Sequence, residues 1–350
     1  MLLPSLLAIL AAAQLTPPTA YDYKQVQLAA SGKSVAATFV WQNKVMFSSS
    51  TDNGALWTEP SVVGEAPALA AGRHRGPRIA FSEDAIVITF IAGKSEKRGA
   101  DGDLFAYRST DRGKTWKQTA RINDVVDAAR EGLHAMASGS KGFLYTAWLD
   151  LRKPGTRLYG SASRDGGLTW SANEEIYQSP EGTICQCCHP SLAIDSHDVI
   201  HVMWRNVIDG NRDFYLASSK DGGKHFSVAE KMGIGSWKLN ACPMDGGDLV
   251  IAENGKPVTV WRREDAIYVA IPGELEREVH VGKDPSIALA RDGTYFAWRD
   301  DQGIEVRTPG KVEPSLLDAD GAYPQLLTLQ DGTVLAAWEH KGQIRFERLR

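Results

Sequence analysis

The chain has 350 residues, 43% of them hydrophobic and 23% charged, which is typical of a globular protein with a large core and excludes a disordered chain. Its formal net charge of -4 gives no general attraction to phosphate backbones or anionic membranes, so we expect no nucleic-acid partner. Length alone leaves one large domain or two ordinary ones open.

The N-terminal segment carries an apolar run of about a dozen residues, too short to cross a bilayer, followed by small residues that suit a signal peptidase. We interpret residues 1–20 as a signal peptide, with cleavage near Ala13 or Ala20, although no Lys or Arg precedes the run. A buried N-terminal strand is the alternative. No later stretch is apolar enough for a membrane helix, so we expect no membrane span and a periplasmic or secreted protein.

The remaining residues, 21–350, contain seven imperfect copies of one unit. Each copy has a short apolar strand, often introduced by Pro, then a polar turn, then an apolar strand that ends in an aromatic residue. The closing aromatic residues are Trp41, Phe90, Trp148, Trp204, Trp261, Trp298 and Trp338. Their spacing fits propeller blades and predicts an all-β, seven-bladed β-propeller that forms a single domain.

A distinctive turn follows the third strand of the first four copies, at residues 50–57, 109–116, 163–170 and 219–226. It reads S-x-D-x-G-x-T-W, with departures at the Thr position in the first and fourth copies and Phe for Trp in the fourth. The pattern suits a hairpin, because Asp can accept backbone N–H groups, Gly can take a positive φ and the aromatic ring can cover the turn. Such turns are structural, so we expect no catalysis from their Asp residues.

These turns resemble the Asp-box, or BNR repeat, of sialidase-like β-propellers, and the resemblance covers essentially all of the chain after residue 20. Sialidases usually have six blades, so a six-bladed propeller is the alternative fold. In a propeller the loops before the innermost strands and after the second strands share one face, opposite the Asp-boxes. We expect that face to bind a small-molecule, glycan or protein ligand, in a monomer. We also expect residues 21–26 to close the ring as the fourth strand of the last blade.

The first candidate site contains all four cysteines of the protein, in two loops that precede adjacent blades. One loop holds Cys185, Cys187, Cys188 and His189, and the other holds Cys242 and Met244; His134 and Met136 could join them. Thiolates, a thioether and an imidazole favour copper or zinc over harder cations. The alternative is structural disulfides, which are common in exported proteins, although three cysteines within four residues suit disulfides poorly.

The C-x-C-C element and the later W-x-x-x-x-C-P element, here residues 237–243, resemble an uncharacterised bacterial branch of sialidase-like propellers. This resemblance carries no known reaction. It supports a dedicated site at the cysteines.

The second candidate site is made of arginines and carboxylates. Arg205, Arg262 and Arg299 each follow a closing Trp, and planar guanidinium groups bind carboxylates bidentately. The resemblance to sialidases, which pair an arginine triad with a Tyr nucleophile, implies Tyr323 as nucleophile and Glu339 as its activator. Against this, the sialidase F/Y-R-I-P signature is missing: residues 76–80 read GPRIA. His189 and Asp284 also occupy the same repeat position as Tyr323, where a polar residue can simply cap the strand.

Three functions therefore remain open. The first is an exported propeller that binds a soft metal or another ligand at the Cys/His/Met cluster. The second is a sialidase-type glycoside hydrolase. The third is a non-catalytic scaffold for a protein or glycan partner.

Overall fold

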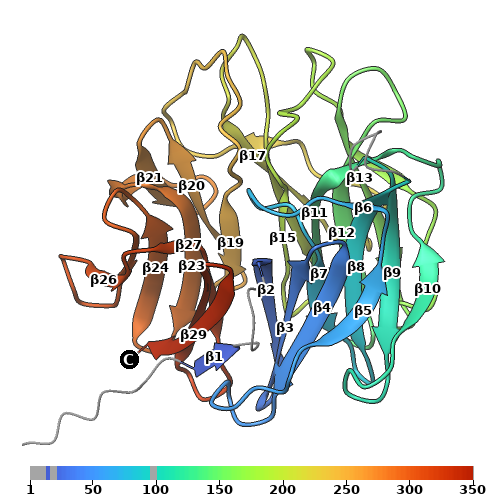
Figure 1. The fold of residues 1–350 in the computed structure, drawn as a ribbon. Coiled ribbons are helices and arrows are strands. Elements are labelled where there is room, and N and C mark those ends of the chain that lie inside the picture. Colours follow the sequence, from blue (N-terminus) through green and yellow to red (C-terminus); the bar gives the residue numbers. More distant parts are fainter. Residues whose placement is uncertain (1–12, 16–21, 95–100, 350) are drawn as a thin grey trace, which may run out of the picture.

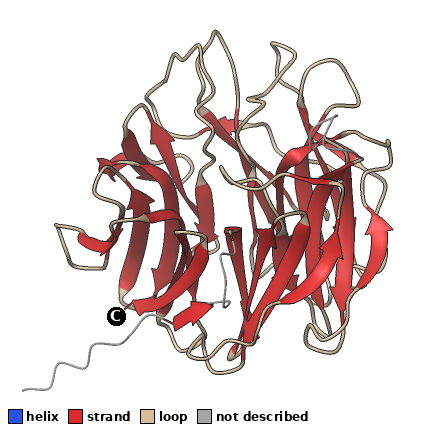
Figure 2. Ribbon diagram, in the orientation of Figure 1, coloured by secondary structure: helices blue, strands red, loops and turns tan. Residues whose placement is uncertain are grey.

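The computed structural model describes residues 13–15, 22–94 and 101–349, and every regular element in this part of the chain is a β-strand (Figures 1 and 2). The strands form seven sheets arranged around one axis. The seven-bladed prediction is confirmed, and the six-bladed alternative is wrong. The described residues include no helix that could cross a membrane.

Each blade is an antiparallel sheet, and from the channel outward its strands follow one another in the chain, except for the outermost strand of blade 7. Blade 1 contains β2 (Tyr23–Ser31), β3 (Ser34–Trp41), β4 (Lys44–Ser50) and β5 (Ser61–Glu65). Blade 2 contains β6 (Ala68–Leu69), β7 (Arg78–Phe81), β8 (Ile86–Gly93), β9 (Asp103–Ser109) and β10 (Lys117–Arg121). Blade 3 contains β11 (Ala129–Ser138), β12 (Leu144–Asp150), β13 (Arg157–Ser163) and β14 (Glu174–Tyr177). Blade 4 contains β15 (Ser191–Ile194), β16 (Ile200–Arg205), β17 (Phe214–Ser219) and β18 (Glu230–Lys231).

The last three blades have the same organisation. Blade 5 contains β19 (Asp248–Ile251), β20 (Pro257–Arg263), β21 (Ala266–Ala270) and β22 (Arg277–Val281). Blade 6 contains β23 (Lys283–Ala290), β24 (Gly293–Arg299), β25 (Ile304–Arg307) and β26 (Ser315–Asp318). Blade 7 contains β27 (Gly321–Thr328), β28 (Val334–His340), β29 (Gln343–Leu349) and β1 (Ala13–Leu15).

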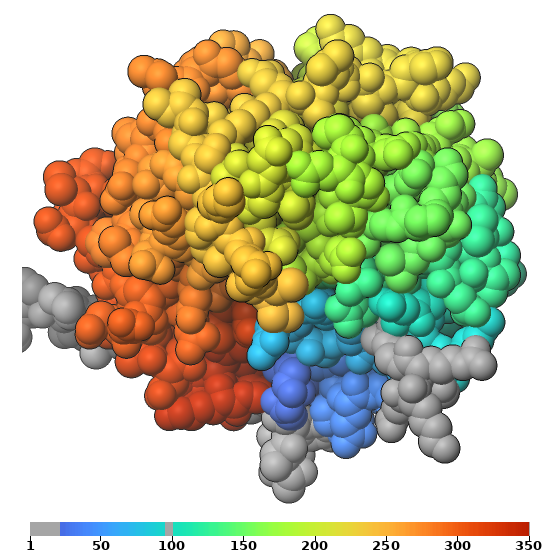
Figure 3. Space-filling model, turned by 90° about the horizontal axis from the view of Figure 1, so that it is seen from above, coloured from blue at the N-terminus to red at the C-terminus, as the bar shows by residue number. Residues whose placement is uncertain are grey.

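The innermost strands pack side by side around the axis in the order β2, β7, β11, β15, β19, β23 and β27, and β27 meets β2 again. Seen from above, the sequence colours follow one another around the molecule until red returns to blue (Figure 3). A buried hydrophobic cluster lies between each pair of neighbouring blades. Six of the seven closing aromatics, all but Trp41, are almost fully buried in the second strands, so the repeated aromatic builds the core between blades.

The ring closes differently from the prediction. Residues 21–26 do not supply the last strand: Tyr23–Ser31 is the innermost strand of blade 1, in a hairpin with β3. The outermost strand of blade 7 is β1, which pairs with β29. β1 lies inside the predicted signal peptide, whose other residues, 1–12 and 16–20, lie outside the described part of the chain. A mature chain cleaved after Ala20 lacks β1, and its last blade then has three strands.

The four Asp-boxes join the third and fourth strands of blades 1 to 4, and their hydrogen bonds match the predicted hairpin. In blade 2, Ser109 Oγ donates to Asp111 Oδ1 over 2.8 Å and accepts the Gly113 N–H over 2.8 Å. The Thr115 N–H donates to the same carboxylate over 2.9 Å, and Trp116 Nε1 donates to the Gly113 carbonyl. Gly113 has a φ of 83°. The hydrogen bonds that Asp111 accepts from the Thr115 hydroxyl, the Thr115 N–H and the Ser109 hydroxyl hold its pKa well below its usual range.

Candidate functional site

The innermost strands of blades 1, 6 and 7 share a bulge at their first residues, where the pairing register shifts. At this bulge Gln25, Asp284 and Tyr323 take φ values of 58°, 54° and 54°. A left-handed conformation costs a non-glycine residue free energy, and such strain is concentrated at functional sites. The bulges therefore mark one end of the channel as the face where side chains are specially placed.

Four side chains from four blades meet at this end, and we call them the channel-mouth cluster: His74, His189, Asp284 and Tyr323. His74 Nε2 lies 2.7 Å from Asp284 Oδ1, and both residues are buried. The His74 ring stacks on the His189 ring with centroids 4.8 Å apart, and Tyr323 meets it edge-on at 5.2 Å. Below the two histidines, a cavity of about 100 Å³ extends into the channel, where Arg78 and Asp248 line it.

The surroundings of the cluster shift the pKa values of its residues in different directions. Burial opposes ionisation of Asp284, but the hydrogen bond from His74 together with the charges of His74, Lys283 and Arg299 outweighs burial and lowers the pKa of Asp284. Burial, aided by the nearby Asp284 and Glu339 carboxylates, raises the pKa of Tyr323. Burial lowers the pKa of His189 well below its usual value, and its Nδ1 is buried without a hydrogen-bond partner. Tyr323 is thus held as a neutral phenol beside a His–Asp pair.

The sequence pattern found part of this cluster. His189, Asp284 and Tyr323 all precede the proline that introduces an innermost strand, and the prediction placed these positions on the functional face. His74 was missed, because it lies in the loop before β7 and matches no repeat position. Its partner Asp284 is 210 residues away in the chain, so no local signal pointed to the pair.

Three of the predicted metal ligands come together, and we call them the thiol cluster: Cys185, Cys187 and Cys188. Cys185 Sγ lies 3.6 Å from Cys187 Sγ and 3.4 Å from Cys188 Sγ, and all three residues are buried. Arg212 Nη1 donates to Cys185 Sγ over 3.2 Å. All four cysteines are free thiols. The arrangement presents three sulfur atoms to one point.

The other predicted ligands divide between this cluster and the channel mouth. Met244 packs against the thiol cluster with a φ of 60°, and its Sδ accepts a hydrogen bond from Arg73 Nη1 at 3.1 Å. Cys242 is exposed, and its thiol contacts Cys187. His189 is separated from the sulfurs because its ring stacks on His74. His134 and Met136 do not join the thiols either.

His134 is buried in the inner strand of blade 3, where its Nε2 lies 3.1 Å from Thr89 Oγ1. Burial lowers its pKa to about 3, so it is neutral. Met136 contacts the same Thr89 hydroxyl and lines the cavity below the channel mouth. Met136 therefore faces the channel cavity, whereas His134 packs against β8 of blade 2.

The pKa values of the three thiols are shifted in opposite directions. Hydrogen bonds from Cys187 and Cys188 lower the pKa of Cys185, and the positive charge of Arg205 acts in the same direction. The hydrogen bond to Cys185 raises the pKa of Cys187, and burial raises the pKa of Cys188. Without a cation the cluster thus favours one thiolate that accepts hydrogen bonds from two thiols.

The predicted arginine triad does not form one open site. Arg205 Nη2 lies 3.2 Å from Asp245 Oδ1 and Arg262 Nε lies 2.9 Å from Asp245 Oδ2, so the two arginines already share one carboxylate. Arg205 is only 1% exposed. Arg262 and Arg299 both line a groove beside Asp300, but Arg205 does not reach it. Glu339 accepts hydrogen bonds from the backbone N–H and side chain of Gln25, at 2.7 and 3.0 Å, and burial raises its pKa.

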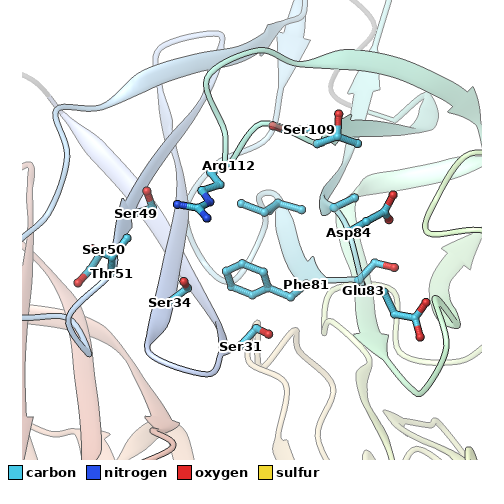
Figure 4. Close-up of a pocket in the computed structure, with 14 residues that line it drawn as sticks. Ser31, Ser34, Ser49, Ser50, Thr51, Phe81, Glu83, Asp84, Ser109 and Arg112 are labelled. Atoms are coloured by element: carbon cyan, nitrogen blue, oxygen red, sulfur yellow. The ribbon is translucent and has the colours of Figure 1, made fainter.

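A groove of about 390 Å³ lies at the opposite end of the sheets, between blades 1 and 2 (Figure 4). Phe81 lies in its middle, with serine hydroxyls on one side and Glu83 and Asp84 on the other. Ser50 and Ser109 in its lining belong to Asp-boxes, and Arg108 neutralises Asp84. The groove is more spacious than the channel mouth, but it lacks a cluster of interacting titratable groups. We therefore place the candidate site at the channel mouth and thiol cluster.

Solved structures share the fold of this chain at low sequence identity. A Penicillium chrysogenum α-L-arabinanase complexed with arabinobiose superposes with a TM-score of 0.59 and 13% identity, covering 97% of this chain and 98% of that one. A polysaccharide lyase of the PL25 ulvan lyase family superposes with a TM-score of 0.60 and 11% identity over 93% of each chain. A Hadza microbial sialidase has a TM-score of 0.52 and 14% identity, covering 94% of this chain and 66% of that one.

No curated protein sequence matches the chain significantly. The sequence profile of the BNR repeat-like domain matches residues 41–336, which include six of the seven closing aromatics, all but Trp338. This range holds the four Asp-boxes, the thiol cluster and most of the channel mouth. The chain belongs to the BNR repeat-like family.

Proposed function

We propose that this protein binds one soft metal ion, Cu(I) or Zn²⁺, at the thiol cluster. The observation that carries the proposal is the meeting of three buried, free thiols, in which the Sγ atoms of Cys187 and Cys188 lie within 3.6 Å of Cys185 Sγ. Thiolate groups are the preferred protein ligands of both ions. A metal would replace the thiol protons that the cluster otherwise has to share.

The surrounding residues fit a negatively charged metal–thiolate centre. Arg212 donates to Cys185, and Arg205 adds positive charge nearby, so both offset the charge of the thiolates. Met244 packs beside the cluster and Cys242 contacts Cys187, so each can supply a further sulfur ligand. Three sulfurs suffice for Cu(I), whereas structural zinc is usually four-coordinate. Cys242 therefore distinguishes the two ions.

Elemental analysis and titration of the reduced protein test the proposal. We expect one metal ion per chain, and Cys185→Ser should weaken binding by about 100-fold or more. Cys242→Ser should spare Cu(I) binding, measured against a chromophoric Cu(I) chelator, and weaken Zn²⁺ binding. Met136→Leu is the control, because Met136 lies in the channel away from the thiols. A reduced, folded protein that binds neither ion would overturn the proposal.

We also propose that the protein is exported to the periplasm or beyond the cell. The apolar run and small residues within residues 1–20 support this. Cell fractionation and N-terminal sequencing of the mature protein test it. A cytoplasmic chain that keeps residues 1–20 would refute export.

A second candidate function is a carbohydrate-active enzyme whose site is the channel mouth. The observation that favours it is the strained assembly of His74, Asp284 and Tyr323. The solved structures support this function through the fold alone, because an arabinanase, a lyase and a sialidase have the same architecture. In this proposal Asp284 orients His74 for proton transfer. Tyr323, kept neutral by its raised pKa, donates a hydrogen bond or proton; the sialidase-type alternative makes it the nucleophile.

A panel of fluorogenic sialosides and arabinofuranosides tests this second function. The proton-transfer version predicts turnover that His74→Gln reduces by about 100-fold or more. The sialidase-type version predicts sialoside turnover that Tyr323→Phe abolishes and that Glu339→Gln strongly reduces. The Cys185→Ser variant should turn over the same glycosides at the wild-type rate. If no glycoside is turned over, or if turnover is unchanged by both His74→Gln and Tyr323→Phe, the function is rejected.

A further inference from the structure

The repeat places corresponding positions, with different side chains, at the junctions between blades. The residue two positions after a closing aromatic lies on the same face of its strand, because side chains alternate along a strand. In blade 6 the closing aromatic is Trp298, the residue two positions on is Asp300, and Glu305 of β25 pairs directly with Trp298. From blade 5, His280 at the end of β22 stacks on Trp298, with ring centroids 4.8 Å apart and planes 24° apart.

The shared Trp298 surface thus brings an imidazole and two carboxylates together. One ligand atom from each of His280, Asp300 and Glu305 lies within 4.8 Å of the other two. All three side chains are partly buried, so solvent screens their charges less than at an open surface. Glu305 Oε2 is buried and has no hydrogen-bond partner.

Other blade junctions show what the protein normally does at this position. At the junction of blades 6 and 7, Asp318 pairs with His340 Nδ1 at 2.7 Å and with Arg345 at 3.7 Å. At the junction of blades 4 and 5, Arg263 pairs with Glu276 at 2.7 Å. In each case an acidic group meets a basic group supplied by the protein.

Beside Trp148 in blade 3, Arg152 pairs with Asp150 at 2.8 Å and with Asp124 at 2.7 Å, so an arginine serves two carboxylates there. At the junction of blades 5 and 6 two carboxylates face an imidazole and, in the described part of the chain, no arginine. Among the described residues neither Asp300 nor Glu305 forms an ion pair with a Lys or Arg side chain.

Hydrogen bonds to the backbone hold two of these three groups. His280 Nδ1 lies 2.9 Å from the Val281 carbonyl, an acceptor only, so Nδ1 carries the proton and Nε2 keeps its lone pair. A backbone carbonyl that fixes a histidine tautomer in this way is the usual second partner of a metal-bound imidazole. Asp300 Oδ1 accepts the Gln302 N–H at 2.7 Å, which holds that carboxylate in place.

We propose that His280, Asp300 and Glu305 bind a divalent cation at the junction of blades 5 and 6. One imidazole and two carboxylates are hard or borderline ligands, so the site takes an ion of the Mn²⁺ class and differs in chemistry from the thiol cluster. The ligands come from two blades, so the ion links β22 of blade 5 to the β24–β25 hairpin of blade 6. The ion would stand at the wall of a groove of about 580 Å³ that Lys283 and Arg299 also line. Their positive charge opposes cation binding, so both carboxylates are needed.

Titration of the full chain with Mn²⁺, followed by the electron paramagnetic resonance signal of the free ion, tests the proposal. Mn²⁺ prefers oxygen ligands, so the thiols compete little. We expect one saturable Mn²⁺ per chain, and a loss of affinity of at least about 10-fold in both Glu305→Gln and Asp300→Asn. The same binding should remain after Cys185→Ser.

Asp301→Asn is the matched control, because Asp301 is adjacent, exposed and outside the cluster. It removes the same charge and should leave Mn²⁺ affinity unchanged. Circular dichroism must show that each variant is folded; the two isosteric changes give independent chances of a folded variant. The proposal is overturned if the wild-type protein shows no saturable Mn²⁺ binding at millimolar concentrations. It is also overturned if Asp301→Asn weakens binding as much as Glu305→Gln, since binding would then reflect surface charge alone.

Discussion

The two ends of the propeller satisfy their polar groups in different ways. At the Asp-box end, Asp111 binds residues at most four positions away in the chain, and the turn repeats almost unchanged in four blades. At the channel mouth, His74 binds Asp284 across 210 residues, and Arg73 binds Met244 across 171. The first end is assembled locally and repeats. The second is assembled once, from unlike loops and strained residues, as a functional site requires.

The largest effect that we predict is a loss of stability at the Asp-box end. Gly113→Ala would place a Cβ 2.0 Å from the Phe47 ring at a φ of 83°. We expect a loss of about 4 kcal/mol of unfolding free energy, from overpacking and backbone strain together. Urea unfolding measures it.

Gly310→Ala is the control for that experiment, because Gly310 has a similar φ of 74° and open space around it. It should lose only about 1 kcal/mol, the cost of the strain. Equal losses in the two variants would show that contact with Phe47 does not constrain the Asp-box.

The next effect concerns the channel mouth. Asp284→Asn removes the charged acceptor of the buried His74 hydrogen bond, and we expect a loss of about 2 kcal/mol. Asp301→Asn, at an exposed position, should change stability by less than about 0.5 kcal/mol. If Asp284→Asn left the unfolding free energy unchanged, the His–Asp pair would not be formed in solution.

A smaller effect is expected at the boundary between the channel mouth and the thiol cluster. Met244→Leu keeps the apolar packing but removes the thioether, so it should weaken Cu(I) binding by about 10-fold without changing its stoichiometry. Competition with a Cu(I) chelator measures the change. Unchanged affinity would exclude Met244 as a ligand.

The smallest effect is a pH dependence at the Asp-box. The folded pKa of Asp111 lies below its usual value of 3.8, so its contribution to stability is present above that pH and is lost as the pH falls below it. Asp111→Asn should therefore be less stable than the wild type at pH 7, and the difference should shrink as the pH falls below 3.8. A constant difference between pH 7 and pH 2 would contradict this cause.

Much of the fold could be read from residues close together in the chain. The closing aromatics predicted seven blades, and the S-x-D-x-G pattern predicted the hairpins, because each depends on spacing within one repeat. The grouping of Cys185, Cys187 and Cys188 was local too. The closing strand was misplaced because pairing between the two ends of a chain leaves little local pattern, and β1 has only three residues.

The sequence by itself determined the repeat, the Asp-boxes and which loops share a face, since strand alternation and turn chemistry act over a few residues. Only the tertiary structure decided which distant side chains meet. It paired Arg205 and Arg262 with Asp245. It stacked His189 on His74 and placed His280 beside Asp300 and Glu305. These contacts depend on blade order, strand register and bulges, which bring residues from separate blades within a few ångströms of one another.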